Sequence, residues 1–257
     1  MDQVLTKWLP FRKPQPAVRL LLLCLPWGGG GASSYCSWAR QFPPYVELWA
    51  IQTPGREGRM LEPPFTDVMA LVAQLGEVIG PQLRLPFCLF GHSVGALVCF
   101  EFARWLRRNA LPAPNRLIVT GAMAPRERRD LRIHHLPDHE FLENVCKYEG
   151  VPAQILNHPD MLSLILPALR ADFQMFETYR YYPEPPLDCP ISAYGGLQDI
   201  ATDEPGIKSW RHETTRDFKM EMIPGGHFFL QTARERFLKE LSDQLLRAGE
   251  IQQPATD

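Results

Sequence analysis

The feature that most limits the folds open to this chain is a sharp corner between two apolar runs. The motif Gly91-His92-Ser93-Val94-Gly95 separates residues 87–90, which are typical of a strand, from residues 96–107, which have helical spacing. A strand that passes directly into a helix must bend sharply, so Ser93 at the corner takes a strained conformation. Glycines two positions away on each side keep side chains out of tight backbone contacts. The motif therefore predicts a nucleophile elbow, which exposes the serine hydroxyl above a sheet.

Apolar runs of strand length alternate with longer amphipathic runs along the rest of the chain. The sequence predicts further strands over residues 20–25, 46–52, 117–120, 191–194 and 218–223. Helices are expected over 67–83 and 232–246, where apolar residues recur at helical spacing. This alternation predicts an α/β fold with a mostly parallel central sheet and helices on both faces.

The alternation breaks between residues 126 and 186. This segment begins with a charged run, continues with helical periodicity and ends in the proline-rich stretch YYPEPPLDCP. We therefore expect a helical insertion over 126–186 within a single domain that spans 17–249. Residues 1–16 are expected to be an N-terminal extension, and residues 250–257 a frayed tail.

The composition excludes several classes of function. The formal net charge is −2 at pH 7, whereas a nucleic-acid binder needs an excess of basic residues. No apolar run reaches the roughly 18 residues of a membrane span, and no signal peptide is recognisable. The six cysteines form no Cys-x-x-Cys pair, which indicates free thiols in a reducing compartment. We therefore expect a cytoplasmic protein with no nucleic-acid or membrane partner, and a monomer, because no helix shows a dimer stripe.

A serine hydroxyl is a poor nucleophile unless a base, itself held by an acid, activates it. Hydrolases with this elbow carry the three groups in the order serine, acid, histidine. Asp199 follows the predicted strand ISAYGG, and Asp203 and Glu204 are rivals further along the same loop. His227 follows the last predicted strand and two glycines in MIPGGHFFL. The three histidines of HHLPDH match no metal-ligand spacing, so no metal site is predicted.

These residues predict an acyl-transfer mechanism in which the serine attacks a carbonyl, the histidine takes its proton and the aspartate orients the imidazole. The tetrahedral oxyanion then needs two N–H donors. One is expected to be the backbone N–H of Val94, directly after the nucleophile. The other should come from the glycine-rich loop CLPWGGGGASSY, where we choose Gly28, with Gly29 as its rival. This loop lacks the Gly-Lys-Ser/Thr ending of a phosphate-binding loop.

Five motifs in order along the chain resemble those of the type II thioesterases, the stand-alone editing hydrolases of polyketide and nonribosomal peptide synthesis. The motifs are LPWGGGGASSY, TPGREGR, LFGHSVGALVCFEFA, LRADFQMFETYRYYPEPPLDCPI and MIPGGHFFL. The resemblance runs from about Leu20 to Leu246, and the medium-chain acyl hydrolases of fatty-acid synthesis look similar too. It implies an α/β-hydrolase fold in which the insertion is a mobile helical lid.

The resemblance also implies a substrate and a set of roles. Family members hydrolyse acyl thioesters held on the phosphopantetheine arm of acyl or peptidyl carrier proteins, and they need no cofactor of their own. Ser93, Asp199 and His227 fall on the family's triad positions. Gly28 falls where relatives often have alanine or methionine, a change that a backbone donor tolerates. Candidate substrate contacts are Trp27, Gly29, Phe173, Phe176 and Phe228.

Two interpretations of the insertion stay open at this point. Its apolar residues either line an acyl pocket or pack its helices onto each other and onto the core, and packing is expected for most of them. Arg170 and Asp172 are interpreted first as structural ion-pairing residues. The run RERRDLR from Arg126 to Arg132 either docks an acidic carrier protein or is a solvated face. Alternative functions on the same triad are a medium-chain fatty acyl carrier protein hydrolase, an acyltransferase or a carboxylesterase. A non-catalytic binder would need a broken triad, and none of the three positions is broken.

Overall fold

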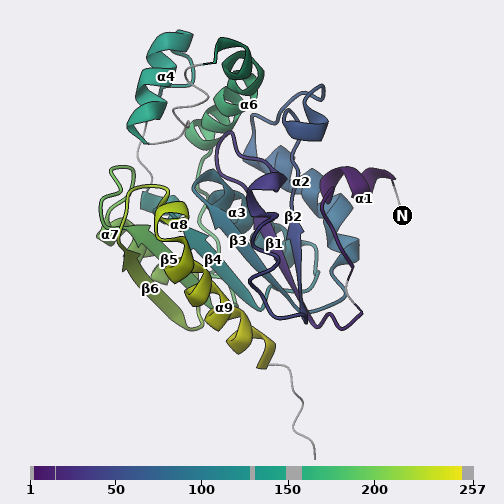
Figure 1. Cartoon of the computed structure of the whole chain (residues 1–257). Helices are drawn as coiled ribbons and strands as arrows, with labels where there is room; N and C mark the ends of the chain where they lie inside the picture. Colours follow the sequence, from purple (N-terminus) through teal and green to yellow (C-terminus); the bar gives the residue numbers. More distant parts are fainter. Residues whose placement is uncertain (1–2, 15, 128–130, 149–157, 251–257) are drawn as a thin grey trace, which may run out of the picture.

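The computed structural model describes residues 3–14, 16–127, 131–148 and 158–250, and its centre is one parallel sheet (Figure 1). The strand order is β2-β1-β3-β4-β5-β6, and every neighbouring pair is parallel. The strands are β1 Leu20–Leu25, β2 Val46–Ala50, β3 Phe87–His92, β4 Arg116–Thr120, β5 Ile191–Gly196 and β6 Phe218–Ile223. The predicted α/β fold with a parallel sheet is therefore confirmed.

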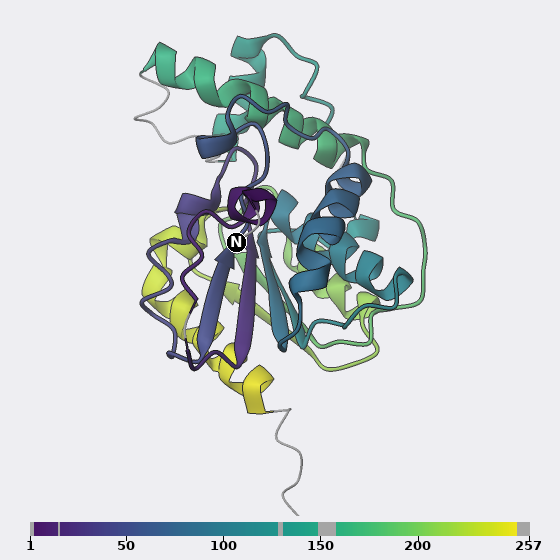
Figure 2. The ribbon, with the colours of Figure 1, turned by 90° about the vertical axis from the view of Figure 1, so that its right-hand side faces the viewer.

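Helices cover both faces of the sheet, as Figure 2 shows. The helices are α1 Gln3–Trp8, α2 Val68–Ile79, α3 Val94–Arg108, α4 Asp138–Lys147, α6 Pro159–Thr178, α7 Glu204–Lys208, α8 Phe229–Thr232 and α9 Arg234–Glu250. Helices α2 and α3 lie against one face, and α8 and α9 lie against the other. Among the described residues, no helix is both long enough and apolar enough to cross a membrane.

Strand β1 shows how the sequence supports two layers of helices. Successive side chains of a strand point to opposite faces of a sheet. Leu21 and Leu23 pack in the cluster that contains α2 and α3, whereas Leu20 and Leu22 pack in the cluster that contains α9. All six residues of the strand are buried. A continuous apolar run is therefore the pattern expected of a strand covered on both faces.

Part of the described chain before position 17 packs onto the core, which the sequence pattern did not indicate. Leu5 and Trp8 are buried in the same cluster as α2 and α3. The Trp8 carbonyl accepts a hydrogen bond from the Gln52 backbone N–H at 2.9 Å, and the Arg59 guanidinium lies 4.6 Å from the Trp8 ring centre. Helix α1 has only six residues, too few for an apolar period to stand out.

Between β4 and β5 the chain leaves the sheet and forms α4 and α6, which lie together at the top of Figure 1. We call these two the insertion helices. They share a small core in which Phe141, Val145 and Leu169 are buried. The segment is thus helical, as its periodicity predicts.

The strand order predicts a ligand-binding crevice at the carboxyl ends of β1 and β3. Strand β1 lies between β2 and β3, so the chain runs outward from β1 in one direction to β2 and in the other to β3. In open parallel sheets, ligands bind beyond the carboxyl ends of the strands at such a reversal. The glycine-rich loop follows β1 and Ser93 follows β3, so both lie at this reversal.

Candidate active site

Ser93 occupies the corner between β3 and α3 in a conformation that side chains rarely adopt. Its backbone has φ 55° and ψ −122°. The Ser93 N–H donates to the Thr120 carbonyl on β4 at 2.8 Å, which ties the corner to the neighbouring strand. Strain of this kind persists only where the surroundings hold it, and it is common at catalytic nucleophiles.

The two glycines of the motif allow backbone segments to approach closely. A Cβ atom on Gly91 would lie 2.2 Å from the Gly95 carbonyl oxygen. A Cβ atom on Gly95 would lie 2.5 Å from the carbonyl oxygens of Leu25 and Pro26, at the end of β1. The glycines therefore allow the elbow to pack directly against the start of the glycine-rich loop.

His227 and Asp199 form a buried pair, although 28 positions separate them in sequence. His227 Nδ1 lies 2.9 Å from Asp199 Oδ2. The carboxylate also accepts hydrogen bonds from the Ala201 N–H at 2.8 Å and from the Thr202 hydroxyl at 2.9 Å. The rival Asp203 instead caps α7 by accepting the Gly206 N–H at 2.8 Å. Geometry therefore favours Asp199 as the partner of the histidine.

The surroundings of Asp199 keep its carboxylate charged. Burial alone would raise the pKa of Asp199, but His227, the Ala201 N–H and the Thr202 hydroxyl together hold the pKa below its ordinary value. A charged carboxylate accepts the proton of Nδ1–H, which leaves Nε2 of the neutral imidazole as the free base. The pair thus fixes the tautomer that a general base requires.

This pKa shift predicts how stability depends on pH. The folded-state pKa of Asp199 lies below the unfolded value of about 3.9, so the charged carboxylate favours the folded state. Its stabilisation is complete above the unfolded pKa and is lost as pH falls through the lowered folded pKa. We expect the difference in unfolding free energy between the wild type and Asp199→Asn to shrink with acidification. Urea titrations from about pH 6 to about pH 3 measure it; a constant difference would contradict the expectation.

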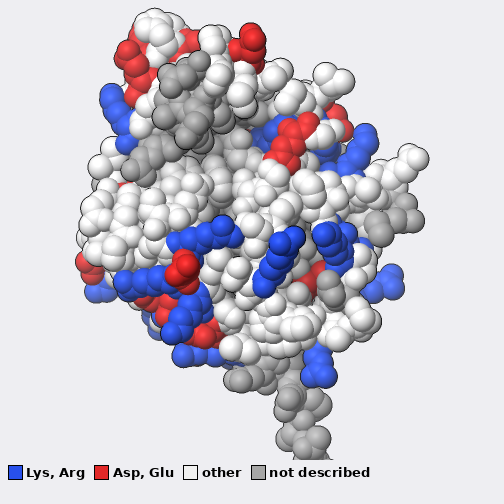
Figure 3. Space-filling view, viewed as in Figure 1, with Lys and Arg blue, Asp and Glu red and all other residues white. Residues whose placement is uncertain are grey.

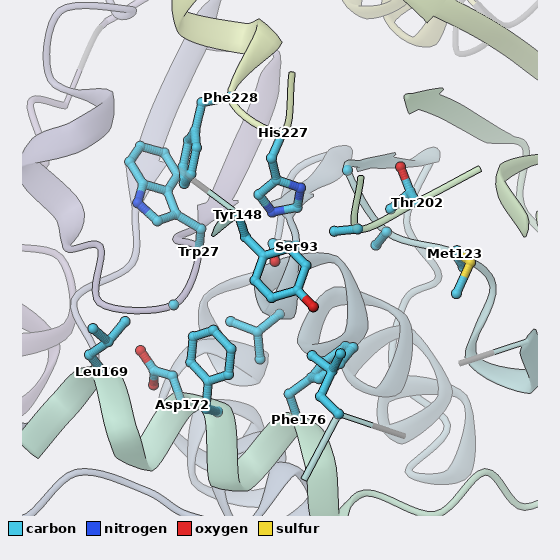
Figure 4. Close-up of a pocket in the computed structure, with 17 residues that line it drawn as sticks. Trp27, Ser93, Met123, Tyr148, Leu169, Asp172, Phe176, Thr202, His227 and Phe228 are labelled. Carbon is cyan, nitrogen blue, oxygen red and sulfur yellow. The ribbon is translucent and has the colours of Figure 1, made fainter. Parts of the chain in front are cut away.

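Ser93 and His227 line one cavity, shown in Figure 4, where the imidazole lies beside the serine. Four of the predicted substrate contacts line it as well: Trp27, Phe173, Phe176 and Phe228. Figure 4 shows Trp27 and Phe228 together on one side of Ser93, and Phe176 opposite them. The lining is mostly apolar, with Asp172 and Thr202 as polar residues besides the catalytic candidates, and the cavity therefore suits an acyl chain.

Gly29, the fifth expected substrate contact, is not among the described residues that line this cavity. Its N–H donates to Asp172 Oδ2 at 2.7 Å. Because Asp172 already accepts this N–H, the geometry favours Gly28 over its rival Gly29 as the oxyanion donor. Gly28 lines the cavity, and its N–H makes no hydrogen bond within the described part of the chain. Val94 begins α3, so its N–H has no acceptor within the helix. Gly28 and Val94 thus remain the candidate oxyanion donors.

Several residues that line the cavity were not singled out from the sequence. Gly121 and Met123 follow the carboxyl end of β4, so the general rule on strand ends would have found them. Leu131 and Tyr148 come from the insertion, and Figure 4 shows the Tyr148 ring in front of Ser93. No local pattern marks these two residues, because their position depends on how the insertion packs on the sheet.

His92 precedes the nucleophile in sequence, is buried, and packs against the ring of His227. The Thr120 hydroxyl donates to the Gly91 carbonyl at 3.1 Å, so it accepts from His92 Nδ1–H at 2.9 Å. Burial, and then the nearby His227, hold the pKa of His92 well below its ordinary value. Its ring centre lies 4.9 Å from that of His227. A neutral ring here packs against the catalytic candidate without placing a second positive charge beside it.

The charged residues of the insertion form ion pairs, as Arg170 and Asp172 were interpreted to do. Arg170 pairs with Asp138 on α4 at 2.6 Å, and Asp172 pairs with Arg56. Among the apolar residues, Phe141, Ile165 and Leu166 pack the insertion helices, while Met161 and Leu164 are exposed.

The run from Arg126 to Arg132 is only partly described, because residues 128–130 lie outside the described residues. Arg126 donates to the buried Glu213 at 2.7 Å. Figure 3 shows that acidic side chains gather on the insertion at the top of that face, while basic side chains lie mainly lower down. Docking of a carrier protein by this run stays a prediction.

Comparisons with known proteins show the family to which the chain is similar. A family model described as the thioesterase domain matches residues 21–245. The gramicidin S biosynthesis protein GrsT of Aneurinibacillus migulanus is 38% identical over 242 residues, which cover 93% of this chain and 94% of that protein. The thioesterase PikA5 of Streptomyces venezuelae is 35% identical over 242 residues, which cover 93% of this chain and 85% of that protein.

Solved structures give the same result. The type II thioesterase BorB from the borrelidin biosynthetic cluster matches with a TM-score of 0.84 and 33% identity, covering 91% of this chain and 96% of its own. The family model spans most of the chain, and each of these relatives aligns over most of its own length. The chain therefore belongs to the thioesterase family, within its type II branch.

Proposed function

We propose that this thioesterase releases aberrant or stalled acyl groups from the phosphopantetheine arm of acyl or peptidyl carrier proteins in nonribosomal peptide or polyketide synthesis. The observation that carries the proposal is the buried His227–Asp199 pair beside Ser93 in a mostly apolar cavity. The similar proteins named above support the pathway, since one is named for gramicidin S biosynthesis and another comes from a borrelidin cluster.

The proposed reaction proceeds through an acyl-enzyme. Ser93 Oγ attacks the thioester carbonyl carbon while His227 Nε2 takes the hydroxyl proton, and the N–H groups of Gly28 and Val94 hold the oxyanion. Collapse of the tetrahedral intermediate breaks the carbon–sulfur bond, and the imidazolium returns its proton to the departing thiolate. The carrier regains its free thiol, and the acyl group is left as an ester on the serine.

Water then repeats the sequence on the ester. His227 takes a proton from the water, the hydroxide oxygen adds to the ester carbonyl, and collapse returns the proton to Ser93 Oγ. The products are a carboxylic acid and the free enzyme. The chain supplies every group that these steps require, and the phosphopantetheine belongs to the substrate.

We place this activity in the cytoplasm, with the chain acting as a monomer. All six cysteines are free thiols, which is typical of a reducing compartment. Burial raises the pKa of Cys88 to about 12, so this thiol stays protonated and unreactive. Sedimentation velocity measures the oligomeric state, and a dimer at micromolar concentration would contradict the monomer.

Single-turnover hydrolysis of acetyl-, malonyl- and octanoyl-loaded carrier proteins tests the proposal, with the matching coenzyme A thioesters beside them. We expect the carrier-bound thioesters to be cleaved at least about tenfold faster, because the carrier adds contacts that coenzyme A lacks. Cleavage of the octanoyl substrate alone would favour chain termination in fatty-acid synthesis. Cleavage of simple oxygen esters but of no thioester would overturn the proposal.

A further inference from the structure

A second buried pair, Arg56 with Asp172, joins two motifs to which the mechanism gives no role. Arg56 belongs to TPGREGR in the loop after β2, and Asp172 belongs to LRADF on helix α6. The contact is bidentate, with Arg56 Nη1 2.6 Å from Asp172 Oδ2 and Nη2 2.8 Å from Oδ1. The two side chains are only 8% and 5% exposed, so the pair is formed away from water. Such pairs combine a strong charge interaction with a fixed geometry.

Both members of the pair form hydrogen bonds with the glycine-rich loop. Asp172 Oδ2 accepts the Gly29 N–H at 2.7 Å, and Arg56 Nη1 donates to the Gly30 carbonyl at 3.0 Å. The loop itself forms a turn in which the Gly30 N–H donates to the Trp27 carbonyl at 2.9 Å. Gly29, at the third position of this turn, has φ +74°, which is typical of a type II turn. The peptide that follows Gly28 is therefore held by a side chain of α6.

Further contacts from the loop after β2 continue along the glycine-rich loop. The Glu57 carboxylate accepts the Ser33 hydroxyl at 2.6 Å, and the Gln52 side chain accepts the Ala32 N–H at 3.1 Å. Burial would lower the pKa of Arg56, but the Asp172 charge offsets this and holds the pKa above its ordinary value. The Arg56 guanidinium therefore stays charged, and it forms the buried ion pair with Asp172.

We propose that Asp172 and Arg56 are positioning residues for the oxyanion hole. They hold the turn from Trp27 to Gly30 so that the Gly28 N–H faces the carbonyl attacked by Ser93. Because Asp172 lies on α6, the hole is complete only while this insertion helix is seated on the loop after β2. This inference rests on the proposed function, since it assumes attack by Ser93 and an oxyanion held by Gly28.

The hydrogen bonds explain why a carboxylate is needed at position 172. Oδ2 receives the Gly29 N–H and an Arg56 N–H, and Oδ1 receives another Arg56 N–H. An asparagine places an NH₂ group against a donor in either orientation of its amide. Asp172→Asn therefore breaks the arrangement with almost no change of volume.

The test compares Asp172→Asn with the wild type on octanoyl-coenzyme A. We expect kcat to fall about 10- to 100-fold with KM changed less than about threefold, since a misplaced donor weakens only the transition state. The inhibition constant of octylboronic acid, which forms a tetrahedral anion on the serine, should rise by a similar factor. The dissociation constant of S-octyl-coenzyme A, which has no carbonyl, should not change. Arg56→Lys keeps the charge but loses the bidentate contact of the guanidinium. It should show the same pattern of changes in kcat and in the inhibition constant, with smaller magnitudes.

Arg170→Met is the matched control, because Arg170 also lies on α6 and forms an ion pair, but with Asp138 and the carbonyl of Leu136. We expect its kcat to stay within about twofold of the wild type. Unchanged kcat in folded Asp172→Asn would overturn the inference, as would equal weakening of the boronate and the thioether. Full activity in Ser93→Ala would overturn the proposed function instead, so the two failures are distinguishable.

Discussion

Ser93→Ala is expected to lower kcat/KM for acyl thioesters by about 10⁴-fold or more, because no other group in the mechanism can form the acyl-enzyme. His227→Ala should cost about as much, since the serine then has no base. Asp199→Asn should cost about 10²- to 10⁴-fold, because the amide no longer fixes the Nδ1–H tautomer. The combined effect of two of these changes should barely exceed that of one, since the three residues act as a unit.

Rapid-quench detection of the acyl-enzyme measures this expectation directly. Wild-type protein mixed with radiolabelled acyl thioester should carry label on Ser93, and Ser93→Ala should carry none. Ser209→Ala is a control, because its hydroxyl donates an exposed hydrogen bond to the Pro205 carbonyl on helix α7, and neither residue lines the cavity. Labelling of Ser93→Ala would mean that another residue is the nucleophile.

Gly95→Ala is expected to destabilise the fold by about 3 kcal/mol or more and to abolish activity. The new methyl group would lie 2.5 Å from two backbone carbonyl oxygens at the end of β1, and backbone atoms cannot move aside as a flexible side chain can. Gly91→Ala should act similarly, through a contact of 2.2 Å with the carbonyl oxygen of Gly95. Urea denaturation followed by circular dichroism gives the change in unfolding free energy.

Gly58→Ala is the matched comparison for these changes. A Cβ atom on Gly58 would meet nothing within 4 Å, so we expect a stability change within about 0.5 kcal/mol and unchanged turnover. A Gly95→Ala protein as stable as Gly58→Ala would show that the elbow can relax, and that close backbone approach is not the reason for a glycine there.

The sequence predicts best those features of the fold and site that a local residue pattern determines. Strand β1, covered on both faces, is a continuous apolar run, and its predicted range of 20–25 matches the observed strand Leu20–Leu25. The elbow is a local motif, whereas Asp199 and His227 were predicted from the order of groups in hydrolases with this elbow and from their places after predicted strands. The structure brings these two residues together. Their catalytic roles stay predictions until the variants are measured.

What the sequence did not predict depends on contacts between distant segments. Arg56 and Asp172 are 116 positions apart, and each is preceded and followed by residues that give no sign of its partner. Tyr148 belongs to the insertion between β4 and β5, and it lines the cavity together with Ser93 and His227 only because of how the insertion packs. Helix α1 is too short to show a period, and Trp8 is buried because the loop after β2 covers it. Hydrophobic periodicity reports which face of an element is covered, but not which distant residue covers it.

The contact between α6 and the glycine-rich loop has a consequence for engineering chimeric enzymes. The insertion looks like a cassette, since it leaves the sheet after β4 and returns at β5. Yet the insertion contains Asp172, whose ion-pair partner Arg56 lies outside the insertion, in the loop after β2. A transplanted cassette that lacks an aspartate at this position would leave a buried guanidinium without its counter-charge, at a cost of several kcal/mol. Grafts intended to change acyl preference therefore have to exchange Arg56 and Asp172 together, or retain both.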